Sequence, residues 1–152
     1  MQQRKEALEQ LCRRFQVVIL YAFGSRAREV REWLAGERSD LPSGPSDVDI
    51  GVKSAPGIRL SVHEKVQLAL ELEDLLGVNR VDLVCLEDAD PFLAANIIRG
   101  ERLYAQDEYL ADEYDLYILR RAGDLVPLER ERMALILGEH HDDRDDLETG
   151  GK

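Results

Sequence analysis

Two aspartates separated by one residue, Asp47 and Asp49, lie in a β-branched apolar run that is typical of a strand. Side chains at positions i and i+2 of a strand point to the same face, so the two carboxylates would stand side by side. Adjacent carboxylates repel each other unless protons, solvent or a cation compensates their charge. Because Mg²⁺ prefers oxygen ligands and keeps coordination positions for phosphate oxygens, the pair indicates a metal site for a phosphorylated substrate.

A glycine-serine turn precedes the aspartate pair along the chain. The apolar run 17–23 ends abruptly in Gly24 and Ser25, and a helix-compatible segment follows. Glycine lets the backbone approach a ligand closely, and the amide groups that open a helix favour an anion. Arg26 and Arg28 add positive charge beside the turn, although a solvent-exposed helix face explains these arginines equally well. Together, the turn and the aspartate pair predict a site for a metal and a triphosphate.

A third carboxylate, Asp82, interrupts the apolar run 81–85. A buried carboxylate is costly unless it is paired or bound to a metal. An arginine, backbone amides or a metal ion would each satisfy it, and the residues alone leave these alternatives open. Spacing by itself carries little weight here, because 31 of the 152 residues are acidic.

Hydrophobic periodicity and turn signals predict the elements that position these side chains. Strands are expected near 17–23, 47–53, 80–86 and 103–105. Helices are expected near 2–14, 25–34, 60–76, 91–99 and 107–121, with a further helical piece to about 137 after a break or kink at Gly123 and Pro127. Ser25 is the expected N-cap of the second helix. The expected buried stripe of the helix 60–76 consists of Val62, Val66, Ala69, Leu72 and Leu76.

Charge and composition restrict the class of protein. The net charge of −11 disfavours direct binding to nucleic acid or to an anionic membrane. Residues 1–38 hold eight Arg/Lys and five Asp/Glu, a local charge of +3, so the remainder carries −14. Without a signal-peptide-like start or a long apolar run, we expect a soluble, cytoplasmic protein. Cys12 and Cys85 lie in apolar patterns and are expected to be buried free thiols.

The length is that of one domain with a two-layer core. We expect residues 1–137 to form this domain. Residues 138–152 are strongly charged and lack an apolar stripe, so we expect a disordered acidic tail.

The motif residues resemble those of a known superfamily. Residues 23–28, Phe-Gly-Ser-Arg-Ala-Arg, and 46–50, Ser-Asp-Val-Asp-Ile, look like the signature of DNA polymerase β-like nucleotidyltransferases. More narrowly, they are similar to the minimal nucleotidyltransferases, the MntA-like proteins encoded beside HEPN-domain toxins. Residues 80–84 match the strand with the superfamily's third carboxylate, and residues 100–104 resemble the MntA-like C-terminal half. Two departures are Glu29, where the family usually has glycine, and a longer loop before the aspartates.

The resemblance implies an α/β (α+β) fold, a small mixed sheet flanked by helices and followed by C-terminal helices. It also implies attack of a hydroxyl on the α-phosphorus of ATP. Asp47 and Asp49 would bridge two Mg²⁺ ions, and Asp82 would complete the catalytic one. The residues implied in nucleotide binding are Gly24, Ser25, Arg26 and Arg28.

The MntA-like match further implies an antitoxin that transfers AMP to a tyrosine of a cognate HEPN ribonuclease toxin, with a homo-oligomer or a hetero-oligomer with the toxin both open. Two other classes remain. A non-catalytic antitoxin with a degenerate site, which Glu29 keeps open, would neutralise the toxin by binding. A small-molecule nucleotidyltransferase would normally carry an additional substrate domain, which we do not expect in this short chain.

Overall fold

The computed structural model describes residues 2–41 and 47–137, with side chains for 2–41 and 47–123. The chain divides into two compact units, Met1–Ile118 and Leu119–Lys152. The first unit contains the sheet, and the described part of the second continues the last helix, α5 (Glu108–Leu137). The expected domain limits of 1–137 stay a prediction, and the expected tail lies outside the described residues.

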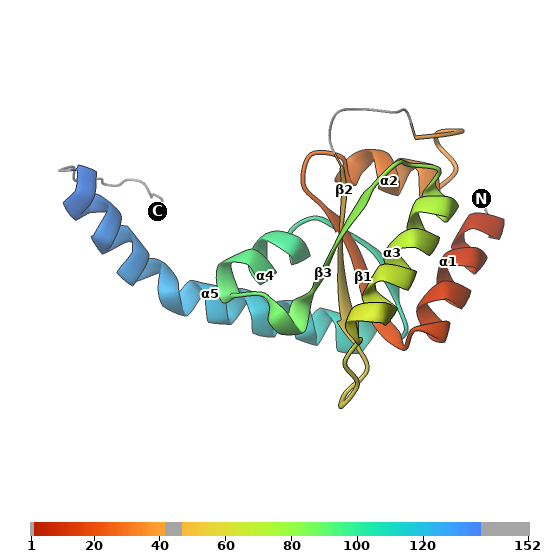
Figure 1. Cartoon of the computed structure of the whole chain (residues 1–152). Helices are drawn as coiled ribbons and strands as arrows, with labels where there is room; N and C mark the ends of the chain where they lie inside the picture. Colours follow the sequence, from red (N-terminus) through yellow and green to blue (C-terminus); the bar gives the residue numbers. More distant parts are fainter. Residues whose placement is uncertain (1, 42–46, 138–152) are drawn as a thin grey trace. The chain divides into compact units, whose positions relative to one another are not determined.

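A mixed four-stranded sheet forms the centre of the first unit (Figure 1). Its strands, in spatial order, are β3 (Val81–Cys85), β2 (Val48–Ser54), β1 (Val17–Phe23) and β4 (Glu101–Ala105). β1 pairs antiparallel with both β2 and β4, whereas β2 pairs parallel with β3. The α/β class and the mixed sheet predicted from the sequence are therefore confirmed.

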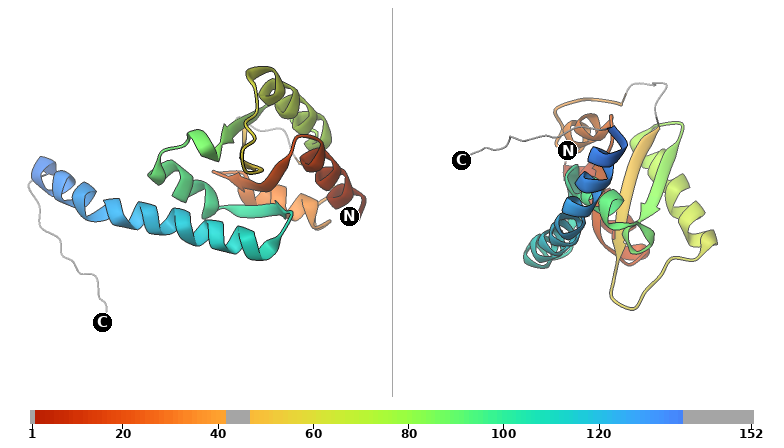
Figure 2. Two further views of the ribbon diagram at one scale, coloured as in Figure 1. Left: turned by 90° about the horizontal axis from the view of Figure 1, so that it is seen from below. Right: turned by 90° about the vertical axis from the view of Figure 1, so that its left-hand side faces the viewer.

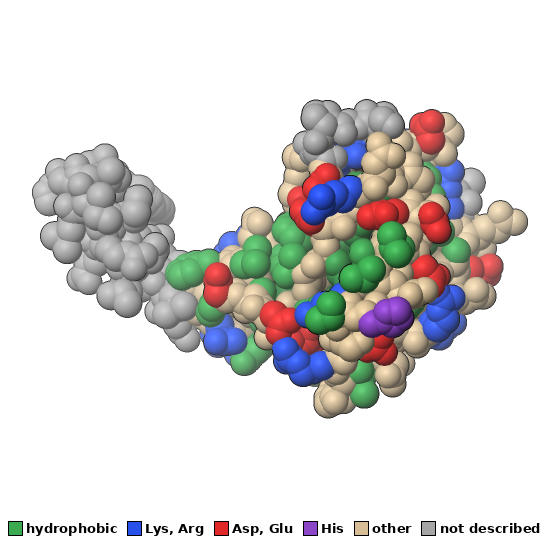
Figure 3. Space-filling model, in the orientation of Figure 1, with side chains coloured by type: hydrophobic (Ala, Val, Ile, Leu, Met, Phe, Trp, Pro, Cys, Tyr) green, Lys and Arg blue, Asp and Glu red, His purple; other side chains and the backbone are tan. Residues whose placement is uncertain are grey.

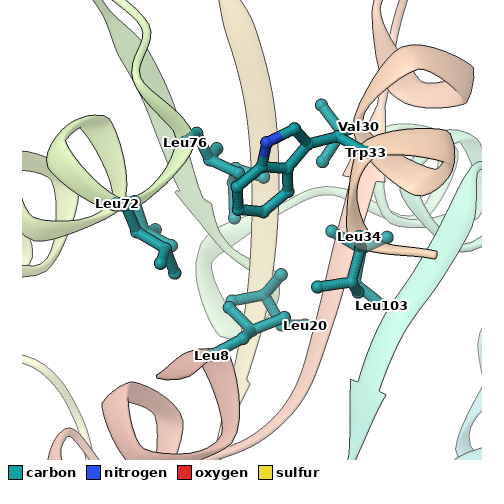
Figure 4. A pocket seen from close by; sticks show the side chains of 10 residues that line it. Leu8, Leu20, Val30, Trp33, Leu34, Leu72, Leu76 and Leu103 are labelled. Carbon is teal, nitrogen blue, oxygen red and sulfur yellow. The ribbon is translucent and has the colours of Figure 1, made fainter. Parts of the chain in front are cut away.

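Three helices cover one face of this sheet: α1 (Gln2–Arg14), α2 (Ala27–Leu34) and α3 (Val62–Leu76) (Figures 1 and 2). Alternate strand residues such as Leu20 and Ile50 point into the resulting core and are fully buried. Figure 4 shows the centre of this core, where leucines from α1, α2, α3 and β1 surround Trp33. The cavity among them is only about 10 Å³ and apolar, so it offers no room for a nucleotide.

The opposite face of the sheet is covered by α4 (Pro91–Ile98) and the beginning of α5 (Figure 2). Gly51 of β2 makes the approach of α4 possible, because a Cβ there would lie 2.5 Å from Ile97 Cγ2. Buried Tyr21 donates its hydroxyl hydrogen bond to Asp115 of α5. Arg102 donates to the other oxygen of the Asp115 carboxylate at 3.1 Å and to Asp112 at 2.7 Å. A polar network thus joins α5 to the sheet.

The segment that leads towards the aspartate pair is tied to the first helix. The Arg4 guanidinium of α1 donates to the carbonyl oxygen of Trp33 at 2.6 Å and to those of Arg38 and Ser39 at 2.9 Å each. It also lies 4.6 Å from the centroid of the Trp33 ring. One arginine therefore satisfies carbonyl groups at the end of α2 and fixes the start of the following loop.

Several predicted details of the helices were wrong. In α3, Val62 and Val66 are exposed, and the buried residues are Leu68, Leu72 and Leu76. The predicted and the observed stripe share Leu72 and Leu76, and packing against the sheet buries Leu68 in place of the two valines. The helix starts with a capping box between Ser61 and Glu64.

The sequence predicted a break or kink in the last helix, and the break was wrong. α5 continues from Glu108 to Leu137 through Gly123 and Pro127. A proline inside a helix removes one N–H donor, and its ring crowds the carbonyl four residues earlier, here that of Gly123. The residues on both sides nevertheless keep the helix continuous.

Cys12 and Cys85 are buried free thiols, as predicted. Burial, followed by the charge of Glu9, raises the pKa of the Cys12 thiol to about 12, so it stays protonated at neutral pH.

Among the described helices, none is both long and apolar enough to cross a membrane.

We predict that Gly100→Ala destabilises the protein by about 2–3 kcal/mol, because the new methyl group would overpack a site without free space. A Cβ there would fall on the carbonyl oxygen of Ala22 and lie 3.0 Å from Phe23 Cα, both of which are backbone atoms held in β1. The matched control is Gly123→Ala in α5, where a Cβ meets nothing within 4 Å and should gain about 0.5–1 kcal/mol. Urea unfolding of both variants measures the difference, and equal stabilities would contradict the close approach of Gly100 to β1.

Candidate active site

The register of the sheet brings three carboxylates to one end of β2 and β3. β2 and β3 are parallel, and Asp49 pairs directly with Asp82. Asp47 precedes Asp49 by two residues, so it belongs to the same face of the sheet. The intervening Val48 and the following Ile50 point into the core on the other face. The three acidic residues predicted from the sequence are therefore neighbours in the fold.

The burial of Asp82 differs from the prediction. The sequence places this carboxylate inside an apolar run, yet its side chain is 51% exposed. β3 is an edge strand, and the Asp82 side chain lies on the face that α3 does not cover. The Asp82 carboxylate is therefore solvated and needs neither a buried partner nor a metal ion to compensate for burial.

The glycine of the turn packs directly against one carboxylate. Gly24 follows the last residue of β1, Phe23, which pairs with Asp49. Its φ of +79° is a conformation that side chains with a Cβ rarely adopt. A Cβ at Gly24 would also lie 2.5 Å from Asp49 Oδ2. Glycine is thus required both by the turn and by the space that the Asp49 carboxylate occupies.

Burial raises the pKa of Asp49 above its ordinary value, and the negative charges of Asp82 and then Asp47 raise it further. Each of these causes disfavours the ionised carboxylate. The site therefore holds negative charge that a cation would stabilise.

An arginine that the sequence analysis did not single out lies against two of the carboxylates. Arg80 Nε is 3.4 Å from Asp47 Oδ2, and Arg80 Nη2 is 3.7 Å from Asp82 Oδ1. The sequence did contain a signal, because Arg80 precedes Asp82 by two residues and strand alternation places both on one face. Figure 3 shows acidic and basic side chains side by side near the start of β2.

The residues expected to bind the nucleotide have different surroundings. Ser25 is exposed and does not cap α2, which begins at Ala27 with Arg26 as the N-cap residue and no side-chain cap hydrogen bond. Arg26 is buried, and its Nε donates to Glu29 Oε1 at 3.0 Å. Arg28 is exposed. The predicted N-cap was therefore wrong, and of the two arginines only Arg28 lies at the surface.

The charge of Glu29 is compensated locally. Glu29 lies in the first turn of α2, and its carboxylate accepts the Arg26 hydrogen bond just described. An acidic side chain in the first turn of a helix also interacts favourably with the helix dipole. Glu29 therefore does not present an uncompensated negative charge to the Gly24 turn.

The carboxylates are suitable ligands for a divalent cation, but their side chains are not arranged as a metal site in this structure. In the described part of the chain, no group of three or more His, Cys, Asp or Glu side chains stands in position to hold a metal ion. Asp47 and Asp82 face Arg80 instead. The donors are nevertheless carboxylate oxygens, which hard cations such as Mg²⁺ prefer. Burial, and after it the charges of Asp82 and Asp47, raises the pKa of Asp49, and a cation would favour its ionised form.

We predict that Asp49→Asn stabilises the metal-free protein relative to wild type, and that the gain grows as the pH rises from about 4 to 7. The pKa of Asp49 is raised in the folded protein, so folding holds its proton more tightly and loses stability when Asp49 ionises. Asparagine removes this ionisation. Thermal unfolding in a chelator across that pH range measures the effect. Asp40→Asn, on an exposed loop, is the charge-matched control, and an equal pH-dependent gain there would contradict the explanation.

Comparison with solved structures identifies the same fold elsewhere. The MntA–HepT toxin–antitoxin structure matches with 21% identity and a TM-score of 0.59, over 90% of this chain and 96% of that one. Tri-AMPylated Shewanella oneidensis HEPN toxin in complex with MNT antitoxin matches with 22% identity and a TM-score of 0.58, over 89% and 94%. A toxin–antitoxin structure with AMP-PNP matches with 21% identity and a TM-score of 0.59, over 87% and 94%. At these identities the likeness establishes the fold.

Comparison at the level of sequence gives the family. No curated protein matches the chain. A profile described as "Polymerase beta, Nucleotidyltransferase" matches residues 6–109, well over half of the chain. This range begins in α1, extends beyond β4 and contains Asp47, Asp49 and Asp82. The chain therefore belongs to the polymerase beta nucleotidyltransferase family.

Proposed function

We propose that this protein is a Mg²⁺-dependent adenylyltransferase that acts as an antitoxin, transferring AMP from ATP to a tyrosine of a cognate HEPN-type ribonuclease toxin. The observation that carries the proposal is the pairing of Asp49 with Asp82, with Gly24 packed against the Asp49 carboxylate. In this chain, the contact between Gly24 and Asp49 places the turn next to the acidic cluster, and we assign the triphosphate to this turn.

Each residue has a role that its surroundings support. Asp47 and Asp49 would hold two Mg²⁺ ions, and Asp82 would complete the coordination of one of them. Such ions neutralise developing charge and orient the triphosphate when they are bound. The backbone at Gly24 and Ser25 would receive the β- and γ-phosphates, and Arg28, which is exposed, would add positive charge near them. Arg26 would act indirectly, because its guanidinium is buried and bonded to Glu29.

The proposed reaction is a single displacement at phosphorus. The acceptor oxygen forms a bond to the α-phosphorus of ATP, and the bond from that phosphorus to the leaving pyrophosphate breaks. The hydroxyl proton passes to the Asp82 carboxylate, which is exposed on the edge strand and therefore accessible to an incoming acceptor. The products are the adenylylated acceptor and pyrophosphate.

A protein acceptor is supported by the solved structures and by charge. One similar structure contains a tri-AMPylated HEPN toxin with its MNT antitoxin, and another contains AMP-PNP. In this chain, the residues after position 38 carry a net charge of −14. Such a surface favours a basic partner, as expected of a toxin that cleaves RNA.

Binding of the nucleotide is tested by two glycine variants. We predict that Mg²⁺-ATP stabilises the wild type by about 2.7 kcal/mol at a hundredfold excess over Kd. Gly24→Ala should lose most of this shift, because its Cβ would displace the Asp49 carboxylate. Gly57→Ala is a close control, since Gly57 has the same φ of +79° but nothing within 4 Å of its Cβ. Thermal unfolding with and without Mg²⁺-ATP compares them.

Both variants should lose about 1 kcal/mol from backbone strain alone, so the difference between them isolates the contact with Asp49. Retention of the full Mg²⁺-ATP shift in Gly24→Ala would exclude this turn as part of the nucleotide site.

The transfer itself is tested with ATP and the purified HEPN protein encoded nearest to this chain. We predict that the toxin gains the mass of one or more AMP units and loses ribonuclease activity. Asp47→Asn should abolish both changes, whereas Asp40→Asn, in an exposed loop, should retain them. Intact-protein mass spectrometry and a ribonuclease assay give the two readouts. Equal rescue from toxicity by wild type and Asp47→Asn, without a mass change, would refute transfer and leave neutralisation by binding.

A further inference from the structure

Arg80 is built into the point where β2 and β3 begin to pair. Its carbonyl oxygen accepts a 3.2 Å hydrogen bond from the Val48 amide, so its backbone is fixed to the strand that bears two of the aspartates. β2 and β3 are parallel, with Val48 opposite Val81 and Asp49 opposite Asp82. One residue earlier in each strand, the same register places Arg80 opposite Asp47. The register therefore positions a permanent cation at the edge of the acidic cluster.

The guanidinium contacts two carboxylates from different strands. Its nitrogens lie 3.4 Å from Asp47 and 3.7 Å from Asp82, longer than the 2.7–2.9 Å typical of charge-assisted hydrogen bonds. The Arg80 side chain is 69% exposed. Exposed ion pairs of this kind are weak and easily exchanged. Arg80 therefore compensates part of the negative charge of the carboxylates, but its weak contacts with them are easily broken.

A divalent cation at the proposed site would use the same carboxylates. Because the guanidinium has no lone pair for a metal and repels other cations, Arg80 and the metal compete for Asp47 and Asp82. An arriving Mg²⁺–nucleotide complex differs from a bare cation, since its phosphates are negative and can receive the displaced guanidinium. The positive charge of Arg80 therefore weakens the binding of a free divalent cation but strengthens the binding of the Mg²⁺–nucleotide complex.

We propose that Arg80 is the resident counter-cation of the carboxylate cluster and competes with free divalent cations, so that the site takes up its metal together with the nucleotide. This inference rests on the proposed function, because it assumes that Asp47, Asp49 and Asp82 bind the cation. Arg80 is a positioning residue in this scheme. It holds the empty site in a compensated state and withdraws when the metal–nucleotide complex binds.

Mn²⁺ without nucleotide is the direct probe. It is titrated into wild type, Arg80→Gln, Arg80→Lys and Arg59→Gln, and electron paramagnetic resonance measures the bound fraction. Arg80→Gln should bind Mn²⁺ about tenfold more tightly, the effect of one unit charge a few ångströms from a divalent cation in water. Arg80→Lys keeps the charge and should stay close to wild type. Arg59 is an exposed arginine paired with Asp88, away from the cluster, so Arg59→Gln is the matched control.

A second titration uses Mn²⁺ with a non-hydrolysable ATP analogue. Here Arg80→Gln should bind more weakly than wild type and Arg59→Gln, opposite to its effect on Mn²⁺ alone. In a chelator, Arg80→Gln should also unfold at a lower temperature than Arg59→Gln, and this loss should diminish when Asp82→Asn is added. A change in both titrations in the same direction would show a general effect of fold or charge and would overturn the proposal.

The failure of this inference can be distinguished from failure of the proposed function. If wild type binds Mn²⁺ and Arg80→Gln binds it with equal or lower affinity, Arg80 is not a competitor, although the metal site stands. If none of the variants binds Mn²⁺ with or without the ATP analogue, the metal site itself is wrong and the inference falls with it.

Discussion

Mutual repulsion of carboxylates at one end of the sheet is the constraint on which the candidate site depends. Val48 and Ile50 are buried in the core, and strand alternation therefore forces Asp47 and Asp49 onto the opposite face. The parallel register adds Asp82 beside Asp49. Hydrophobic burial on one face thus supplies the free energy that holds like charges together on the other. The pKa of Asp49 is raised first by its own burial and then by the charges of Asp82 and Asp47.

The face that bears the carboxylates is held by contacts of another kind. α4 reaches β2 at Gly51, two residues beyond Asp49, because no side chain is present there. The hydroxyl of Tyr21 and the guanidinium of Arg102 share the two oxygens of Asp115, and this joins α5 to β1 and β4. Burial raises the pKa of Asp115, but both partners offset this effect and support its charged form. The helices on this face are therefore positioned by a glycine contact and a polar network.

Two arginines near the site pair with acidic residues, and the sequence motif alone does not show these pairs. Arg26 pairs with Glu29, the residue found where the family usually has glycine, and so removes an unfavourable charge from the turn. Arg80 lies between Asp47 and Asp82 and compensates the cluster from its edge. In the folded protein, Glu29 is thus paired and the cluster is compensated only in part, because one arginine faces three carboxylates.

The sequence by itself determined most of the strands and helices and which acidic residues share a face, because these depend on local patterns. Period-two alternation around Asp47 and Asp49 predicted their common face, and the abrupt end of an apolar run at Gly24 predicted the turn beside them. Tertiary packing decided what local patterns leave ambiguous. The sequence predicted a buried stripe of α3 that includes Val62 and Val66, and packing against the sheet buried Leu68 instead. Asp82 is exposed because β3 is an edge strand. Arg80 faces Asp47 because of the register between β2 and β3, which cannot be read from the sequence of either strand alone.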